Sequence, residues 1–149
     1  MKYLLDSNTI SMLYDSQAVG HSSIKSRLES LDDEADQVFV SVLTIYEMEF
    51  GKANAPEDKA KIIQKDIQHT LKNFSLLSLS IRGASLFGDL KKRLKDSRNI
   101  SPENMRKHNV DLMLASTAII ESCRLVSADR IYTELQQLES QLKIKNWMI

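Results

Sequence analysis

The chain has 149 residues, with 20 Lys and Arg against 20 Asp and Glu, and 42% of its residues are hydrophobic. This balance is typical of one globular domain, residues 1–149, that buries a sizeable core without disulfides. The single cysteine, Cys123, excludes a disulfide framework and a cysteine-based zinc site. Because the net charge is zero, a nucleic-acid partner would have to be met by local basic clusters or by bound cations.

No membrane-spanning or secretory segment is expected. The apolar run from Val110 to Ile120 is interrupted by Asp111 and Ser116 and is shorter than the roughly 18 residues that a membrane span needs. Near the N-terminus, Asp6 stands where a signal peptide has its apolar middle. We therefore expect a cytoplasmic protein with no membrane partner.

Short β-favouring runs alternate along the chain with longer helical patterns. The short runs are Lys2–Leu5, Gln37–Val40, Leu76–Leu79, Arg124–Val126 and Ile144–Trp147. The helical patterns are Val42–Lys52, Glu57–Phe74, Ile81–Lys95, Asn109–Cys123 and Ile131–Leu142. Strands that alternate with helices predict a mostly parallel sheet with helices on both sides, whose functional groups gather at the carboxyl ends of the strands.

Four acidic residues occupy informative places in this pattern. Asp6 directly follows the first predicted strand and Asp129 follows the fourth, so both are expected at carboxyl strand ends. Glu47 lies on a helix between apolar neighbours, which places a carboxylate on an apolar face. Asp111 opens a helix that is apolar nearly all round and is therefore expected to be buried.

Each acid alone also has an ordinary explanation. Asp6 could cap a helix, and Asp129 could simply start the last helix. Asp111 could sit in a first helical turn, where the helix dipole favours negative charge. The stem of Glu47 could cross apolar surface while its carboxylate reaches water or Lys52.

Taken together, the four acids are harder to explain this way. Buried carboxylates are costly unless they are paired or bound to metal, and four acids that converge without basic partners would repel one another unless cations joined them. Ligands that are all oxygen suit Mg²⁺ or Mn²⁺, which commonly join carboxylates to substrate phosphates. The set therefore indicates metal-assisted phosphodiester chemistry.

The order and surroundings of these acids resemble the PIN domain family, specifically the VapC-like ribonuclease toxins of bacterial toxin–antitoxin pairs. The matching segments are Tyr3–Asn8, Ser41–Gly51, Asp111–Ala118, Leu125–Asp129 and the closing Leu142–Trp147. The resemblance covers essentially the whole chain. Two departures are mild: Ser127 stands where Thr is commoner, and Tyr132 where Phe often falls.

The resemblance implies a three-layer α/β/α sandwich with a short, mostly parallel five-stranded sheet. It also implies a Mg²⁺- or Mn²⁺-dependent endoribonuclease that blocks translation, forms homodimers and is inhibited by a small antitoxin. Asp6, Glu47 and Asp111 would hold the metal, and Asp129 would complete the site directly or through water. Asn8 and Ser127 would orient these carboxylates through hydrogen bonds, without binding the metal themselves.

Two basic segments are candidates for holding the RNA. Arg106 and Lys107 stand just before Asp111 and are the better candidates for phosphate contacts, and the neighbouring His108 could also approach a phosphate. The denser run from Lys91 to Arg98 is interpreted instead as a solvated helix face.

Other functions fit the sequence less well. A haloacid-dehalogenase-like enzyme would have a second Asp where Asn8 stands, and a receiver-like domain would have an acid at the third strand. No glycine-rich loop supports dinucleotide binding. The remaining alternatives are a catalytically inactive PIN-like binding module and a housekeeping PIN nuclease.

Overall fold

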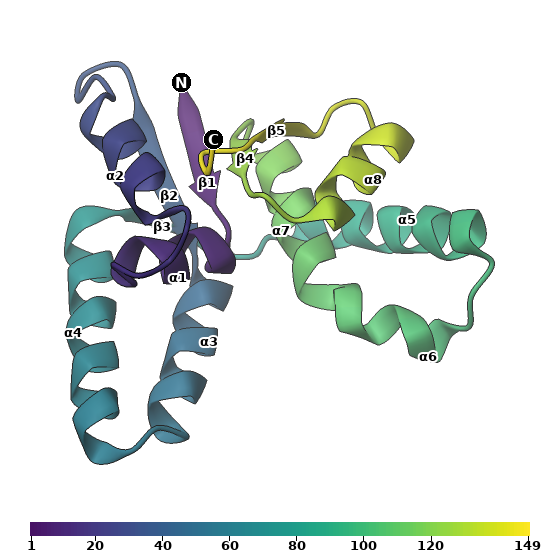
Figure 1. Ribbon diagram of the computed structural model, residues 1–149. Coiled ribbons are helices and arrows are strands. Elements are labelled where there is room, and N and C mark those ends of the chain that lie inside the picture. Colours follow the sequence, from purple (N-terminus) through teal and green to yellow (C-terminus); the bar gives the residue numbers. More distant parts are fainter.

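The computed structural model describes residues 1–149 and is built around a five-stranded, fully parallel sheet with strand order β3-β2-β1-β4-β5 (Figure 1). The strands are β1 (Lys2–Leu5), β2 (Gln37–Ser41), β3 (Ser75–Leu77), β4 (Arg124–Val126) and β5 (Lys143–Lys145). The helices are α1 (Ser7–Tyr14), α2 (His21–Glu29), α3 (Val42–Ala53), α4 (Glu57–Asn73), α5 (Ile81–Arg98), α6 (Pro102–Met105), the 3₁₀ turn η1 (Arg106–His108), α7 (Asn109–Ile120) and α8 (Arg130–Leu138).

Both faces of the sheet are covered. Successive strand residues point to opposite faces, so Leu4 enters the core formed with α5, α7 and α8, while Leu5 enters the core formed with α1 and α2. The second core is closed by Trp147, which lies just after β5 and packs against Tyr3 with ring centroids 5.1 Å apart. This confirms the predicted three-layer α/β/α sandwich.

Two helical arms project from the carboxyl side of the sheet. Helices α3 and α4 form one antiparallel arm, and α5 with α6 and η1 forms the other (Figure 1). The first residues of α1 lie between the arms, at the carboxyl end of the central strand β1. None of the helices combines the length and hydropathy needed to cross a membrane.

Each predicted strand is a strand and each predicted helix is a helix in the structure, but some of them begin or end at other residues than predicted. The third strand is Ser75–Leu77 rather than Leu76–Leu79, because Ser80 already caps α5 by accepting a hydrogen bond from the Gly83 amide at 3.1 Å. Helix α8 ends at Leu138 instead of Leu142. Helices α1 and α2 were not predicted, since their apolar residues are too few to show a helical period.

Candidate active site

Asp6 lies at the centre of the candidate site, between the end of β1 and the start of α1. Its side chain is 3% exposed and caps α1: Oδ1 accepts a hydrogen bond from the Thr9 amide at 2.8 Å, while Oδ2 accepts one from the Ser127 hydroxyl. Burial raises the pKa of Asp6 and the charge of Asp129 adds to this, against the lowering effect of the two hydrogen bonds.

Ser127 links Asp6 to the loop that carries Asp129. Its Oγ accepts a hydrogen bond from the Asp129 amide at 3.0 Å, and its own amide donates to the Lys145 carbonyl at 2.9 Å. The Asp129 side chain is exposed and caps α8 by accepting from the Ile131 amide at 3.1 Å. The hydrogen bond from Ser127 to Asp6 is the contact expected of an orienting residue.

Asp111 lies in the first turn of α7 and is partly buried. Tyr132 donates a hydrogen bond to Oδ1 at 3.3 Å, and His108 Nδ1 lies 3.7 Å from Oδ2. Burial raises the pKa of Asp111, and the charge of Asp129 raises it further. The negative charges of Asp111, Asp6 and Asp129 all raise the pKa of the buried Tyr132 hydroxyl, after burial itself. Tyr132 therefore contacts Asp111 directly and is close enough to Asp6 and Asp129 for their charges to act on it.

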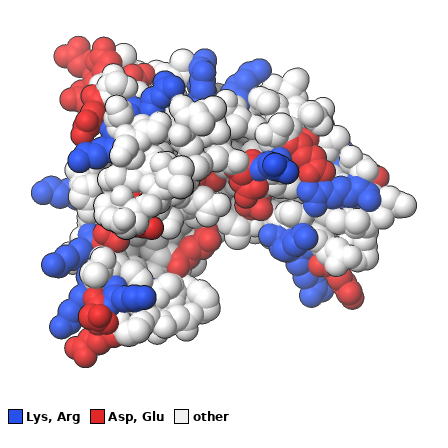
Figure 2. Space-filling model, in the orientation of Figure 1, with Lys and Arg blue, Asp and Glu red and all other residues white.

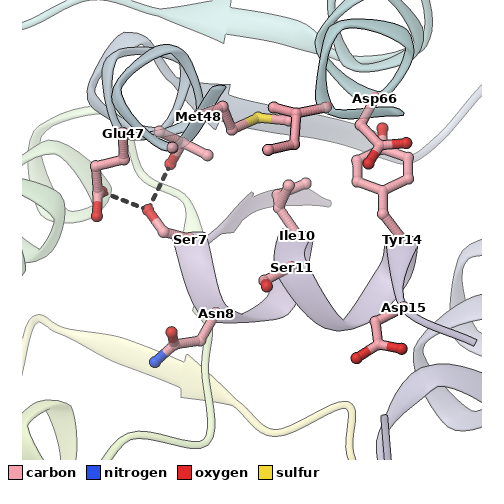
Figure 3. A pocket seen from close by; sticks show the side chains of 12 residues that line it. Ser7, Asn8, Ile10, Ser11, Tyr14, Asp15, Glu47, Met48 and Asp66 are labelled. Atoms are coloured by element: carbon pink, nitrogen blue, oxygen red, sulfur yellow. Dashed lines mark hydrogen bonds between the residues drawn. The ribbon is translucent and has the colours of Figure 1, made fainter. Parts of the chain in front are cut away.

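Glu47 approaches from α3 on the other side of Asp6. It accepts a hydrogen bond from the Ser7 hydroxyl at 2.7 Å, and the same hydroxyl lies 2.9 Å from Thr44 Oγ1 (Figure 3). Since Ser7 directly follows Asp6, this contact ties Glu47 to the start of α1. Asn8, the predicted orienting residue, is exposed and makes no hydrogen bond to any of the acids.

A cleft of about 410 Å³ extends from this point between α1, α3 and α4. Figure 3 shows Ser7 and Tyr14 at opposite ends of α1, with Glu47 and Met48 reaching from α3 and Asp66 from α4. The lining combines apolar side chains with three carboxylates, those of Asp15, Glu47 and Asp66. The cleft is therefore acidic, and Ser7 and Glu47 belong to its lining.

The four acids differ in burial. Asp6 is buried and Asp111, on the helix expected to be buried, is partly so, whereas Glu47 and Asp129 are exposed. Asp6 and Asp129 do cap helices, as their ordinary explanation predicted. Capping does not remove either residue from the candidate site. Lys52 pairs with Glu49 at 2.8 Å and not with Glu47.

The donor set fits a hard divalent cation, although the side chains are not gathered around one point. No three Asp, Glu, His or Cys side chains lie close enough together to hold a common ion. However, none of the four acids forms an ion pair with Lys or Arg. Burial raises the pKa values of Asp6 and Asp111, and repulsion from Asp129 raises both further. Oxygen ligands with uncompensated negative charge are what Mg²⁺ and Mn²⁺ bind.

The two basic segments differ in their partners. Arg106 and Lys107 are exposed on η1 and form no ion pair. The run on α5 is largely neutralised: the pairs are Lys92–Asp96, Arg93–Asp89, Arg93–Glu139 and Arg98–Glu134. In Figure 2, acidic side chains are visible in the hollow between the two arms, and basic side chains lie mostly toward the outer edges.

Comparison with known proteins explains this arrangement. Residues 3–138 match the model of the PIN domain. The chain belongs to the PIN domain family. Members of this family are in general nucleases, so the acidic centre lies in the kind of domain that cleaves nucleic acid. A search of the curated proteins found no match.

Solved structures share the PIN fold along the whole chain. VapBC2 from Rickettsia felis, bound to a DNA fragment from its promoter, is 21% identical with a TM-score of 0.77, covering 99% of both chains. VapBC-1 from nontypeable Haemophilus influenzae is 19% identical with a TM-score of 0.76, covering 100% of both. FitAcB from Neisseria gonorrhoeae is 20% identical with a TM-score of 0.73, covering 97% of both.

Proposed function

We propose that this PIN domain protein is a Mg²⁺- or Mn²⁺-dependent endoribonuclease in which Asp6, Glu47, Asp111 and Asp129 hold the metal. The observation that carries the proposal is the set of contacts at the carboxyl ends of β1 and β4: Ser127 donates to the buried Asp6 and accepts from the Asp129 amide, and no Lys or Arg pairs with Asp6, Asp111 or Asp129. The charge of Asp129 repels those of Asp6 and Asp111 and adds to the rise that burial causes in their pKa values. A divalent cation would offset this repulsion, and a nuclease needs positive charge at the scissile phosphate.

The protein supplies orientation at each ligand. Thr9 and Ser127 fix both oxygens of Asp6, and Tyr132 fixes one oxygen of Asp111. When bound, the cation would lower the pKa of an attacking water and stabilise charge on the scissile phosphate. No side chain acts as the nucleophile in this proposal. The chain contributes the carboxylates that hold the metal and the hydrogen-bond partners that orient them.

RNA is the proposed substrate, and Arg106 with Lys107 its proposed phosphate contacts. Both side chains are unpaired and exposed on the turn that leads into the helix of Asp111. The acids themselves repel phosphate, because both are negatively charged. Arg106 and Lys107, just before the helix of Asp111, would supply positive charge next to them. Contacts of this kind position the backbone without reading its sequence.

We further propose that the protein is the toxin of a toxin–antitoxin pair that blocks translation, acts in the cytoplasm and forms a homodimer. The similar structures are VapBC and FitAB complexes. A small antitoxin would cover the site through the cleft beside Glu47, where apolar side chains and three carboxylates suit a helix with a basic residue. Co-purification with a short protein encoded next to its gene would support this partner.

The nuclease proposal is tested with purified protein and single-stranded RNA. Cleavage is expected with Mn²⁺, is abolished by EDTA and returns when Mn²⁺ is added back. Asp6→Asn and Asp111→Asn are expected to lower the rate by about 100-fold or more, because lost charge stabilisation is worth several kcal/mol.

The matched control is Asp58→Asn, which removes a carboxylate from the exposed start of α4. This variant should cleave like the wild type. Metal-independent cleavage, or full activity in Asp6→Asn, would contradict the proposed metal ligands. A folded wild type that binds RNA but never cuts it would be an inactive binding module.

A further inference from the structure

A chain of polar contacts runs from α8 through α5 and η1 to Asp111. Arg98, at the end of α5, holds the carboxylate of Glu134 with two nitrogens: Nε lies 2.8 Å from Oε1, and Nη2 contacts Oε2. Its remaining nitrogen, Nη1, lies 2.7 Å from His108 Nε2. The guanidinium therefore connects an acid on α8 with the histidine that precedes α7.

This contact determines where the hydrogen of His108 lies. A guanidinium has five N–H donors and no acceptor, so Nε2 must accept the hydrogen bond from Arg98. An imidazole that accepts at Nε2 is neutral and carries its hydrogen on Nδ1. In His108 that nitrogen faces Asp111, with Nδ1 3.7 Å from Oδ2.

We propose that Arg98 and Glu134 fix His108 as the Nδ1–H tautomer, and that His108 thereby acts as a positioning residue for Asp111. The inference rests on the proposed function, since it concerns one of the proposed metal ligands. Tyr132 donates to Oδ1 of the same carboxylate, and the Nδ1–H of His108 faces Oδ2 from 3.7 Å, a distance longer than a hydrogen bond. In this proposal the two neutral groups limit the orientations of Asp111 without cancelling the negative charge that a cation needs.

The same geometry argues against the predicted phosphate contact of His108. Its Nε2 is occupied by Arg98, and the side chain is only 13% exposed. Glu134 keeps Arg98 in place, because the carboxylate accepts from two of its nitrogens in a paired arrangement that fixes the plane of the guanidinium. Phosphate contacts are thus left to the exposed Arg106 and Lys107.

The tautomer is tested first, by ¹⁵N NMR of the imidazole nitrogens in metal-free protein at pH 7.5. We expect the signals of a neutral ring protonated at Nδ1 for His108, and a mixture of tautomers in Arg98→Gln. A ring protonated at Nε2 in the wild type would overturn the proposal. This measurement does not depend on whether the protein is a nuclease.

The role is tested by Mn²⁺ affinity, measured by calorimetry on His108 variants. His108→Gln and His108→Ala lack a donor at the Nδ1 position and should bind Mn²⁺ about tenfold or more weakly, as expected when a partner behind a metal ligand is lost. His108→Asn places an amide N–H near the Nδ1 position and should restore most of the affinity. Equal affinity in His108→Gln and the wild type would overturn the role.

The matched control compares two arginines of α5. Arg98→Gln should weaken Mn²⁺ binding like His108→Gln, whereas Arg93→Gln should not, because Arg93 pairs with Asp89 and Glu139 and does not contact His108. Thermal melting of each variant identifies any that fail to fold. If the wild type itself binds no Mn²⁺, the proposed function fails and the role of His108 with it, while the NMR result still decides the tautomer.

Discussion

At the scale of single residues, Asp6 has two structural tasks. It begins α1 by accepting from the Thr9 amide, and it presents a buried carboxylate to the candidate site. The raised pKa shows that its ionised form is disfavoured by burial in the absence of a cation. The residue therefore reduces the stability of the metal-free fold at neutral pH.

We predict that Asp6→Asn stabilises the metal-free protein, increasingly so as the pH rises. Because the folded pKa is raised above the usual 3.8, the wild type retains the contribution of Asp6 below pH 3.8 and loses it as pH rises through the folded value. Urea denaturation in EDTA at pH 4.5 and pH 7.5 measures this. A stability difference between variant and wild type that shrinks with rising pH would contradict it.

Tyr132 is a residue-scale finding that the sequence did not predict. From the sequence it is only a departure from Phe, because the apolar periodicity of a helix does not distinguish a buried Tyr from a buried Phe. Yet it lies three residues after Asp129 on α8, which places both on one side of the helix. That spacing is the available signal, but using it requires knowing that Asp129 is the residue that caps α8.

We predict that Tyr132→Phe keeps the fold and lowers cleavage about tenfold, since Asp111 loses a donor that orients it. The free energy of unfolding should fall by about 0.5–1.5 kcal/mol, the usual value of one hydrogen bond. Steady-state kinetics and urea denaturation test this. Unchanged cleavage would mean that Tyr132 only fills the core.

At the scale of elements, the strands and long helices were predictable because their patterns are strong. β1 and β4 have the predicted ends, and α4 keeps its predicted start after Pro56. Helix α1, with eight residues, has too few turns to show a period, and η1 is shorter still. The order of the acids along the chain was predictable, but Ser7 was not, since its contact with Glu47 spans 40 residues of sequence.

The turn η1 supplies one prediction, for binding rather than catalysis. Arg106→Ala should weaken RNA binding and reduce the slope of log Kd against log salt by about 1, because one phosphate contact is lost. Binding in EDTA with fluorescent RNA at several salt concentrations measures the slope. Lys59→Ala on α4 is the control and should have the wild-type slope. If Arg106→Ala also has the wild-type slope, Arg106 does not contact the RNA.

The ion pair between Arg93 on α5 and Glu139 at the end of α8 predicts how the stability of the fold changes at low pH. Hydrogen bonding from Arg93 lowers the pKa of Glu139 below its usual 4.5, so the pair stabilises the fold above pH 4.5 and the contribution is lost as pH falls through the lowered value. Glu139→Gln should lose about 0.5–1 kcal/mol at pH 7 and nearly nothing at pH 2.5. Denaturation at both pH values checks this.

At the scale of the whole molecule, the parallel sheet brings the site together. Asp6 and the Ser127–Asp129 loop follow neighbouring parallel strands, so they meet at one edge without any local sequence relation. The sequence predicted that both acids lie at the carboxyl ends of parallel strands, but it did not predict the strand order that makes these strands neighbours. The sequence did not predict the exposure of Glu47, because the cleft between α1, α3 and α4 beside it leaves no periodic pattern in the sequence.

A whole-molecule consequence is that metal should stabilise the fold. Free Mn²⁺ at about 100 times its Kd should add roughly 2.7 kcal/mol to the free energy of unfolding, and EDTA should remove this increment. Melting curves with and without Mn²⁺ measure the shift. Asp111→Asn should lose most of it, and a full shift in that variant would place the ion elsewhere.

The hydrogen bonds of Asp6 also limit how it can coordinate. Each of its oxygens already accepts one donor, from Thr9 on one side and Ser127 on the other. Since a carboxylate oxygen has two lone pairs, each oxygen of Asp6 retains one lone pair for a cation. The two donors also prevent the carboxylate from rotating, so an ion would have to approach Asp6 along directions that the start of α1 and the Ser127 loop leave open.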